Sequence, residues 1–313
     1  MGERKRHFVS IIIPLLNEQE SLEELYSRMT AMLEGTAAGH ELLFIDDGST
    51  DGSLAILRKL REGDSRVKIM SFQRNYGKSA ALSEGFRVAR GDIVVTIDAD
   101  LQDSPEEIPA LIDKLDEGYD LVSGWKINRQ DPVSKTLPSK FFNFVTSLVS
   151  GIKLHDFNCG LKAYRGEVVK RVSVYGELHR FIPVLAGLEG FKVTERRVTH
   201  SARKFGTSKY GVARFLNGFF DLVTVMFVTR RAASPLHFFG RVAVVFLAVG
   251  GVITLYFLFL WILGRGLHVR PIMVGGLVMI VIAIQIGSFG LLAELFTSRM
   301  ERTFAYRDYQ IDD

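Results

Sequence analysis

Short apolar runs alternate with amphipathic stretches over the first 125 residues of the chain. The apolar runs are rich in β-branched residues, and each is followed by a segment whose apolar residues recur three and four positions apart. This pattern predicts strands followed by helices, and therefore a mostly parallel sheet with helices on both faces. The predicted strand and helix pairs are 8–13 with 21–33, 41–46 with 53–60, 67–72 with 78–89, and 92–98 with 106–115.

The fourth of these helices has the clearest start signal. Ser104 is expected to be its N-cap, Pro105 its first residue, and Glu107 the second member of a capping box. Gly118 is expected to close its far end. The residue just before the cap, Asp103, is interpreted as a turn residue.

Two long runs without Asp, Glu, Lys or Arg lie near the C-terminus, at 242–264 and 271–293. Each run has 23 residues, and a helix of that length extends about 35 Å, enough to cross a bilayer. A pair of buried core helices is the alternative, although uncharged runs of this length are rare in soluble folds. The short connection makes the pair a hairpin. We therefore predict a first transmembrane helix at 235–264, a second at 270–295 and a tail at 296–313.

Basic residues decide the predicted orientation of this hairpin. Residues 201–313 carry 12 Lys and Arg against 6 Asp and Glu, and most of the basic ones flank the hairpin on the side of the N-terminal domain. The positive-inside rule then places that domain, 1–204, and both termini in the cytosol. Between domain and hairpin, apolar residues spaced three and four apart among basic ones predict amphipathic helices on the membrane surface at 205–234, with a core-facing helix as the alternative.

The N-terminus and the cysteine count bear on the compartment. The chain begins with basic residues, but the apolar stretch that follows is short and ends at Asn17 and Glu18, so we predict a strand and not a cleavable signal. The chain has one cysteine, Cys159, which excludes an internal disulfide and fits a reducing compartment.

Polar side chains gather where the predicted strands end, which is where parallel sheets bind ligands. Asp98 and Asp100 follow the fourth strand and point the same way in an extended chain, with Gln102 just beyond. Such oxygens suit Mg²⁺ or Mn²⁺, which take one or two protein carboxylates and complete their shell with water and phosphate. A metal-free turn is the alternative. The other strand ends carry Asn17 and Glu18, Asp46 and Asp47, and the segment 74–78.

Two further patterns concern phosphate binding. The GKS sequence at 77–79 is not a P-loop, because Phe72 stands where that motif needs glycine, and no G-x-G-x-x-G supports a dinucleotide oxidoreductase. Lys78 instead lies at a predicted helix start, where a phosphate could bind. Arg203 and Lys209, in HSARKFGTSKY, could clamp a diphosphate or a lipid phosphate. Basic residues that snorkel before a membrane helix are the alternative.

Six motifs, in this order, resemble those of family 2 glycosyltransferases of the polyprenyl-phosphate type, which include dolichyl-phosphate mannose synthases and bactoprenol glucosyltransferases. The resemblance extends over about residues 7–210, and the hairpin is similar to that of the bactoprenol subgroup. It implies an α/β domain with the nucleotide-diphospho-sugar transferase fold (GT-A, Rossmann-like), followed by interfacial helices and a two-helix transmembrane hairpin. The motifs are VSIIIPLLNE, DDGSTDGS, RNYGKSAAL, DADLQDSPE, DFNCGLKAYR and HSARKFGTSKY.

The resemblance also implies roles for the residues that match its motifs. Asp100 and Gln102 would hold the metal, Asp156 would be the acceptor-side catalytic aspartate, and Arg203 would close over the diphosphate. A turn residue is the alternative for Asp156. The residues implied to bind the nucleotide sugar are Pro14, Asn17, Glu18, Asp47, Asn75, Lys78, Asp98, Ser208 and Lys209, and those implied to bind the lipid phosphate are Arg129 and Lys140.

The implied reaction is the inverting transfer of a hexose to polyprenyl (undecaprenyl) phosphate at the cytosolic face of a bacterial inner membrane, with Mg²⁺ or Mn²⁺. The resemblance favours glucose from UDP-glucose; GDP-mannose, UDP-N-acetylglucosamine and UDP-aminoarabinose are alternative donors. A processive polysaccharide synthase is disfavoured, because no arginine precedes Trp125 or Trp261 as the Gln-x-x-Arg-Trp motif requires. A catalytically silent lipid- or partner-binding membrane protein is a further alternative.

The partners expected from this interpretation are a nucleotide-diphosphate sugar, polyprenyl phosphate and the membrane, and no nucleic acid. Self-association stays open, because glycines in the second span permit close helix packing. These are Gly275, Gly276, Gly287 and Gly290.

Overall fold

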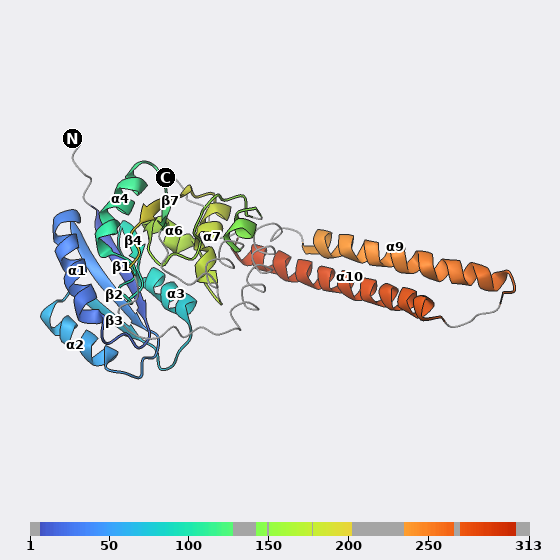
Figure 1. Ribbon diagram of the computed structural model, residues 1–313, viewed down its shortest axis with the longest axis horizontal. Coiled ribbons are helices and arrows are strands. Elements are labelled where there is room, and N and C mark those ends of the chain that lie inside the picture. The colour runs from blue at the N-terminus through green and yellow to red at the C-terminus, as the bar shows by residue number, and fades with distance from the viewer. Residues whose placement is uncertain are drawn as a thin grey trace. The chain divides into compact units, whose positions relative to one another are not determined.

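The N-terminal part of the protein is built on one seven-stranded sheet (Figure 1). The computed structural model describes residues 7–127, 142–148, 150–176, 178–201, 235–265 and 270–304. The chain divides into two compact units, Met1–Val225 and Met226–Asp313. The strand order is β3-β2-β1-β4-β6-β5-β7, and β6 alone is antiparallel to its neighbours. The strands are β1 (Phe8–Leu15), β2 (Gly39–Asp46), β3 (Val67–Ser71), β4 (Ile93–Thr96), β5 (Leu121–Lys126), β6 (Lys162–Arg165) and β7 (Val193–Val198).

Helices cover both faces of this sheet, as the alternating pattern predicts (Figure 1). Ile11 and Ile13 of β1 pack in one core cluster with α1, α2 and α4, whereas Ile12 packs in a second cluster with α3, α6 and α7. Successive side chains of a strand point to opposite faces, so a strand buried on both faces is a continuous apolar run. The helices are α1 (Leu22–Thr36), α2 (Ser53–Gly63), α3 (Lys78–Val88), α4 (Ile108–Asp116), α6 (Gly166–Arg171) and α7 (Ile182–Leu188), with 3₁₀ turns η1 (Pro105–Glu107) and η2 (Leu178–Phe181).

The strand order reverses between β1 and β4. The chain runs from β1 outward to β2 and β3, and then returns to the other side of β1 to form β4. Parallel sheets bind ligands in the crevice that this reversal opens at the carboxyl ends of the strands. Leu15 is in register with Asp46, and Ile12 with Thr96, so the segments that follow β1, β2 and β4 emerge at the same edge.

The start of the fourth helix differs from the predicted capping box. Pro105–Glu107 form a 3₁₀ turn, and Ser104 makes no side-chain capping hydrogen bond. Glu107 instead accepts hydrogen bonds from the backbone N–H and hydroxyl of Thr199, at 3.0 and 2.7 Å. The sequence pattern was misleading because a partner 92 residues away competes for the same carboxylate. The predicted end of the helix is confirmed, since Gly118 follows it with a φ of 102°.

The second unit contains two long apolar helices, α9 (Pro235–Ile262) and α10 (Pro271–Phe304), which pack side by side. Their segments Leu236–Ile262 and Pro271–Leu295 are long and apolar enough to cross a membrane. Only 6 % and 11 % of these segments is buried, unlike the core helices of a soluble fold. The helix α10 continues to Phe304, within the predicted tail.

Glycines bring the two apolar helices together. A Cβ on Gly276 would lie 2.7 Å from Ile253, and one on Gly290 would lie 2.8 Å from Phe239. Two of the four glycines that we considered for self-association thus serve contacts within the hairpin. Gly275 has no atom within 4 Å of a Cβ position.

Candidate active site

The turn after β4 carries the two aspartates of the Asp-x-Asp pattern. Asp98 and Asp100 are half-buried, and the backbone N–H of Gln102 donates to Asp100 Oδ1 at 3.2 Å. Leu101, which follows Asp100, has a φ of 59°, a conformation that a leucine adopts only under constraint, and its side chain is 2 % exposed. Burial of Leu101 in the core thus holds the turn and both carboxylates at the strand end.

Lys78 joins the start of α3 to this turn. Its ammonium lies 2.5 Å from Asp98 Oδ1, and the two side chains are 32 % and 31 % exposed. The ion pair places a cation beside the Asp-x-Asp turn, as expected for a site that binds phosphate groups.

Asp47 organises the loops that follow β2 and β3. It is 5 % exposed, and its two carboxylate oxygens accept hydrogen bonds from the backbone N–H groups of Tyr76 and Gly77 at 2.7 and 2.9 Å. Gly48 beside it has a φ of 76°, and a Cβ there would lie 2.5 Å from the Arg74 carbonyl carbon. Asp47 therefore orders the segment that contains Asn75, which is exposed.

The end of β1 is tied to the same edge. Asn17 has a φ of 55°, and its Oδ1 accepts a hydrogen bond from the Thr50 N–H at 2.7 Å. The Glu18 N–H donates to Ser53 Oγ at 3.0 Å. Pro14 is in β1, in register with Ile45. The structure thus brings the predicted residues of the first two motifs to one loop cluster.

The loop before β6 lies against Asp98. Asp156 is 1 % exposed and accepts a hydrogen bond from the Asn158 N–H at 3.0 Å. Four residues on, a Cβ on Gly160 would lie 2.4 Å from Asp98 Oδ2, so a larger residue there would displace the Asp98 carboxylate. The neighbouring His155 is stacked on Trp125 with ring centroids 4.0 Å apart, and its backbone N–H donates to Glu195 at 2.7 Å. These contacts fix the loop that carries Asp156.

Asp103 is not the turn residue that we expected. It is 1 % exposed, lies 2.7 Å from the Lys126 ammonium and 3.5 Å from His200 Nδ1, and forms a β-bridge with His200. Burial acts to raise the pKa of Asp103, but the nearby Lys126 ammonium, followed by His200, lowers it to about 2. The Ser201 N–H donates to the Gln102 carbonyl at 2.9 Å. This cluster ties the Asp-x-Asp turn to β5 and to the chain that follows β7.

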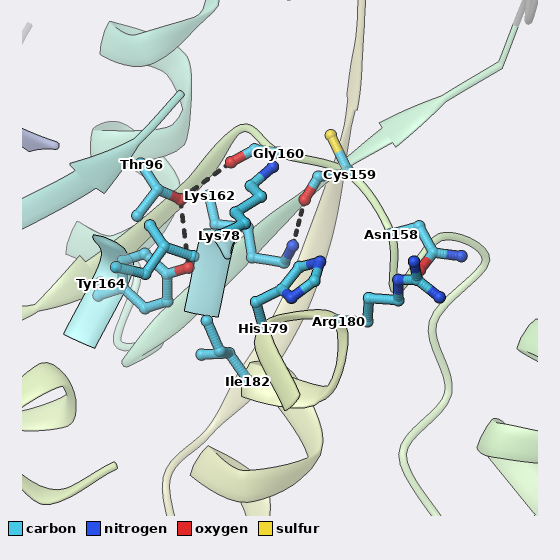
Figure 2. Close-up of a pocket in the computed structure, with 11 residues that line it drawn as sticks. Lys78, Thr96, Asn158, Cys159, Gly160, Lys162, Tyr164, His179, Arg180 and Ile182 are labelled. Carbon is cyan, nitrogen blue, oxygen red and sulfur yellow. Dashed lines mark hydrogen bonds between the residues drawn. The ribbon is translucent and has the colours of Figure 1, made fainter. Parts of the chain in front are cut away.

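A small pocket lies beside Asp98 and is lined by cationic and polar side chains (Figure 2). Burial, followed by the charges of Lys78, Arg180 and Lys162, lowers the pKa of His179 to about 2, so this ring is neutral. Burial lowers the pKa of Lys162 and raises that of Tyr164. Cys159 is 1 % exposed, and burial raises the pKa of its thiol to about 12.

The donor atoms at the turn fit a divalent cation that is shared with a substrate. In the described part of the chain, no group of three or more His, Cys, Asp or Glu residues forms a metal site. The turn offers the carboxylates of Asp98 and Asp100 and the amide of Gln102, and Asp98 is already paired with Lys78. Mg²⁺ and Mn²⁺ commonly bind through one or two carboxylates and fill their shell with water and phosphate oxygens. Asp100 and Gln102 fit that requirement.

Several predicted site residues lie outside the described residues. They are Arg129, Lys140, Arg203, Ser208 and Lys209, together with the predicted amphipathic helices at 205–234.

The sequence matches the family model described as Glycosyl transferase family 2 over residues 10–173. The chain belongs to this family. The matched region runs from β1 to just beyond α6. It therefore includes Asp47, Lys78, Asp98, Asp100, Asp156 and Lys162.

Two relatives of this family 2 glycosyltransferase match most of its length. It is 39 % identical over 307 residues to a dodecaprenyl-phosphate galacturonate synthase of Rhizobium johnstonii, with 96 % of this chain and 89 % of the relative covered. It is 41 % identical over 244 residues to an undecaprenyl-phosphate 4-deoxy-4-formamido-L-arabinose transferase of Salmonella enteritidis, with 78 % of this chain and 73 % of the relative covered. The resemblance inferred from the six motifs is thereby confirmed.

Solved structures agree on the fold of the transferase. A mannosyltransferase from Pyrobaculum calidifontis in complex with GDP-Man and Mn²⁺ superposes with a TM-score of 0.53 at 21 % identity, covering 72 % of this chain and 64 % of the other. Glucosyl-3-phosphoglycerate synthase from Mycobacterium tuberculosis, in complex with Mn²⁺, UDP-glucose and phosphoglyceric acid, has a TM-score of 0.53 at 18 % identity, covering 71 % and 79 %. The predicted GT-A fold is confirmed.

Sequence reasoning missed several residues that the fold brings to the site. Lys162, His179 and Arg180 line the pocket beside Asp98, and Lys126 pairs with Asp103. A signal existed for Lys162, since a lysine interrupts the apolar run before Ala163 in a buried strand. His179 and Arg180 lie about 80 residues from the Asp-x-Asp turn, in a segment with no motif of its own, and only the folded chain relates them.

A methyl group at Gly160 is expected to impair the transferase through Asp98. In Gly160→Ala the new Cβ would lie 2.4 Å from Asp98 Oδ2, so the carboxylate must move, and we expect kcat/KM to fall about 10- to 100-fold, as for displaced catalytic groups. Steady-state kinetics with the donor identified below would measure this. Gly63→Ala, on α2 with no atom within 4 Å of the Cβ position, is the matched control. Activity of Gly160→Ala within twofold of the control would contradict the expected contact.

Proposed function

We propose that this protein transfers a sugar from a nucleotide-diphosphate donor to polyprenyl phosphate. The observation that supports this most strongly is that both relatives described above, at 39 % and 41 % identity, are named for a polyprenyl phosphate and a sugar. The first aligns over 96 % of this chain, including the two apolar helices. The polar strand ends and the cationic side chains beside Asp98 supply the chemistry that two phosphorylated substrates need.

The proposed reaction is a single displacement. An oxygen of the acceptor phosphate attacks the anomeric carbon of the sugar, and the bond from that carbon to the diphosphate oxygen breaks. The electron pair of that bond leaves with the nucleoside diphosphate, and the anomeric centre is inverted. Because the acceptor phosphate is already anionic near neutral pH, little general-base assistance is required. Catalysis then consists mainly of holding two anionic reactants in line and stabilising the charge on the leaving group.

The described residues divide this work between the strand ends. The loops ordered by Asn17 and Asp47 would receive the nucleoside, and Pro14, Glu18 and Asn75 belong to the same cluster. Lys78, held by Asp98, would contact the diphosphate.

Metal and acceptor would meet on the other side of Asp98. Asp100 and Gln102 would hold Mg²⁺ or Mn²⁺, which when bound neutralises charge on the departing diphosphate. Asp156, which is buried in the loop before β6, would orient the acceptor. The other residues proposed to contact substrate phosphates are Arg203, Ser208 and Lys209 for the diphosphate, and Arg129 and Lys140 for the lipid phosphate.

The proposed location is the cytosolic face of a bacterial inner membrane. Its support is the pair of apolar helices and the excess of 12 basic over 6 acidic residues in 201–313. The proposed organisation is a cytosolic domain at 1–204, amphipathic helices at 205–234, spans at 235–264 and 270–295, and a cytosolic tail at 296–313. An acceptor embedded in the bilayer would then meet the site at the membrane surface.

The donor sugar is the part of the proposal that needs measurement. Glucose, the sugar favoured by the motif resemblance, is in the name of neither relative. The test offers the purified full-length protein undecaprenyl phosphate, Mn²⁺ and a panel of labelled donors: UDP-galacturonate, UDP-glucose, UDP-N-acetylglucosamine, GDP-mannose and the uridine diphosphate of 4-deoxy-4-formamido-L-arabinose.

We expect one donor to give label that partitions into organic solvent, and only when undecaprenyl phosphate is present. The chromatographic mobility of the extracted lipid identifies the product. The absence of extractable label with every donor, from protein that is folded, would overturn the proposed function.

A further inference from the structure

The pocket beside Asp98 is positively charged. Three cationic side chains line it, from three separate elements: Lys78 at the start of α3, Lys162 at the start of β6, and Arg180 in η2. Among the residues that the structure describes, the lining includes no carboxylate, and Asp98 lies against two of the lining residues, Lys78 and Gly160. The polar groups of Thr96, Tyr164 and His179 complete the wall (Figure 2).

Lys162 is the central feature of this wall. The residue is 4 % exposed, and its ammonium donates to the Cys159 carbonyl, the one hydrogen bond recorded for it among the described residues. An ammonium has three donors, and burying its charge without an anionic partner is costly. Burial and the charge of Lys78 lower the pKa of Lys162, whereas Asp156 and Asp98 act to raise it. An anion bound in the pocket would favour the charged form of Lys162, and the remaining donors of its side chain suit such an anion.

His179 adds polar character without adding charge. Ser79 Oγ lies 2.9 Å from its Nδ1 and accepts its backbone N–H at 3.2 Å. Because burial and the neighbouring cations keep the ring neutral, the pocket does not become more cationic at mildly acidic pH. The anion would be recognised by Lys162 and Arg180, and the histidine would shape the wall.

The position of the pocket indicates which part of a substrate reaches it. It is walled by Thr96, which ends β4, and by Gly160, which touches Asp98. With the diphosphate at Lys78 and Asp100, the sugar attached to that diphosphate lies against Asp98. A group on the far side of that sugar would then face the pocket, whose lining by Lys162 and Arg180 suits an anionic group.

We propose that Lys162 and Arg180 form a subsite for the carboxylate of a uronic acid, so that this protein selects a nucleotide-diphosphate uronic acid over the corresponding neutral hexose. This inference rests on the proposed function and names its donor class. The acceptor phosphate is the other oxyanion that could occupy the same subsite, and the experiment separates the two.

The test uses donors that differ only at carbon 6, which are UDP-galacturonate against UDP-galactose and UDP-glucuronate against UDP-glucose. For the full-length protein we expect at least one uronate to exceed its neutral partner by about 100-fold in kcat/KM, because the carboxylate gains charge-assisted hydrogen bonds that a neutral hydroxymethyl group does not make. In Lys162→Met we expect this ratio to fall to within about threefold of unity, because a single charged contact can carry a factor of this size. A ratio measured within one preparation does not depend on how much of the protein is active.

Two further variants support the comparison. Arg180→Gln, at a half-buried position, should also reduce the ratio. It provides the test if Lys162→Met does not fold. Lys59→Met, whose side chain is 79 % exposed on α2, should leave the ratio unchanged.

Several results would overturn the carboxylate subsite. One is a wild-type ratio below about threefold, which is less than one charged hydrogen bond supplies. Another is an unchanged ratio in both Lys162→Met and Arg180→Gln. A third is a rise in KM for undecaprenyl phosphate in Lys162→Met or Arg180→Gln, relative to wild type, that is equal with both donors of a pair. That result would assign the pocket to the acceptor phosphate instead.

Calorimetric binding of the four donors without acceptor separates this inference from the proposed function. Selective binding of a uronate that depends on Lys162, in a protein that transfers no sugar, would leave the subsite standing while the proposed function fails. Transfer of a neutral sugar without uronate selectivity would support the proposed function and overturn the subsite. Failure to bind any of the four donors also overturns the subsite.

Discussion

Asp100→Asn is expected to reduce sugar transfer by about 1,000-fold or more, because it removes the carboxylate proposed to hold the divalent cation. A loss of that size corresponds to about 4 kcal/mol of transition-state stabilisation. The substitution keeps the shape of the side chain and an oxygen that can still accept the Gln102 N–H, so the turn held by Leu101 should persist. The measurement is kcat/KM over a titration of Mn²⁺, in which the variant should also need a higher concentration for half-maximal activity.

The matched control is Asp113→Asn, the same chemical change at a half-buried position of α4, which should stay within about twofold of wild type because it lies outside the candidate site. Addition of a chelator to the wild-type protein should abolish transfer, and Mn²⁺ or Mg²⁺ should restore it. Retention of more than a tenth of the activity by Asp100→Asn, or transfer that continues in the presence of the chelator, would remove the metal from the proposed mechanism.

Lys126→Met is expected to destabilise the N-terminal unit by about 3–5 kcal/mol, because it leaves the carboxylate of Asp103 buried without its cation. Asp103 is 1 % exposed and the Lys126 side chain 13 % exposed, so water cannot replace the lost partner. The same pair supports the Asp-x-Asp turn through Gln102, and the variant should therefore also bind Mn²⁺ more weakly. Denaturant titration of the full-length protein in detergent, followed by tryptophan fluorescence, measures the loss.

A second substitution separates the lost charge from lost packing. In Asp103→Leu/Lys126→Met both charges are absent, and such replacements commonly restore most of the stability that a single removal costs. Lys59→Met, at an exposed lysine of α2, should change stability by less than about 0.5 kcal/mol. If Lys126→Met were as stable as Lys59→Met, the pair between Asp103 and Lys126 would contribute nothing to the fold.

The sheet could be predicted because its information is local. The strands β1, β2 and β4 are largely apolar runs buried on both faces, as Ile11, Ile12 and Ile13 of β1 illustrate, and each is followed by a helix. The convergence of Asp47, Lys78 and Asp98 at one edge also followed, because the carboxyl ends of parallel strands share an edge.

The parts that sequence reasoning missed depend on long-range contacts. Asp103 looked like a turn residue, since nothing near it in sequence shows that Lys126 and His200 enclose it. Glu107 matched the sequence pattern of a capping box, but its carboxylate accepts a hydrogen bond from Thr199 instead. The antiparallel strand β6, inserted between β4 and β5, carries Lys162 into the site, and a simple strand–helix alternation does not predict such an insertion.

The buried thiol of Cys159 has a practical consequence for labelling this protein. It is the one cysteine in the chain, it is 1 % exposed, and its raised pKa keeps it protonated at neutral pH. Maleimides and other thiol reagents react with accessible thiolates, so a cysteine introduced at the surface will be the one that they modify in the native state. Slow modification of Cys159 itself would report opening of the structure around it. A fluorophore or spin label can therefore be attached to the natural sequence without first removing a cysteine.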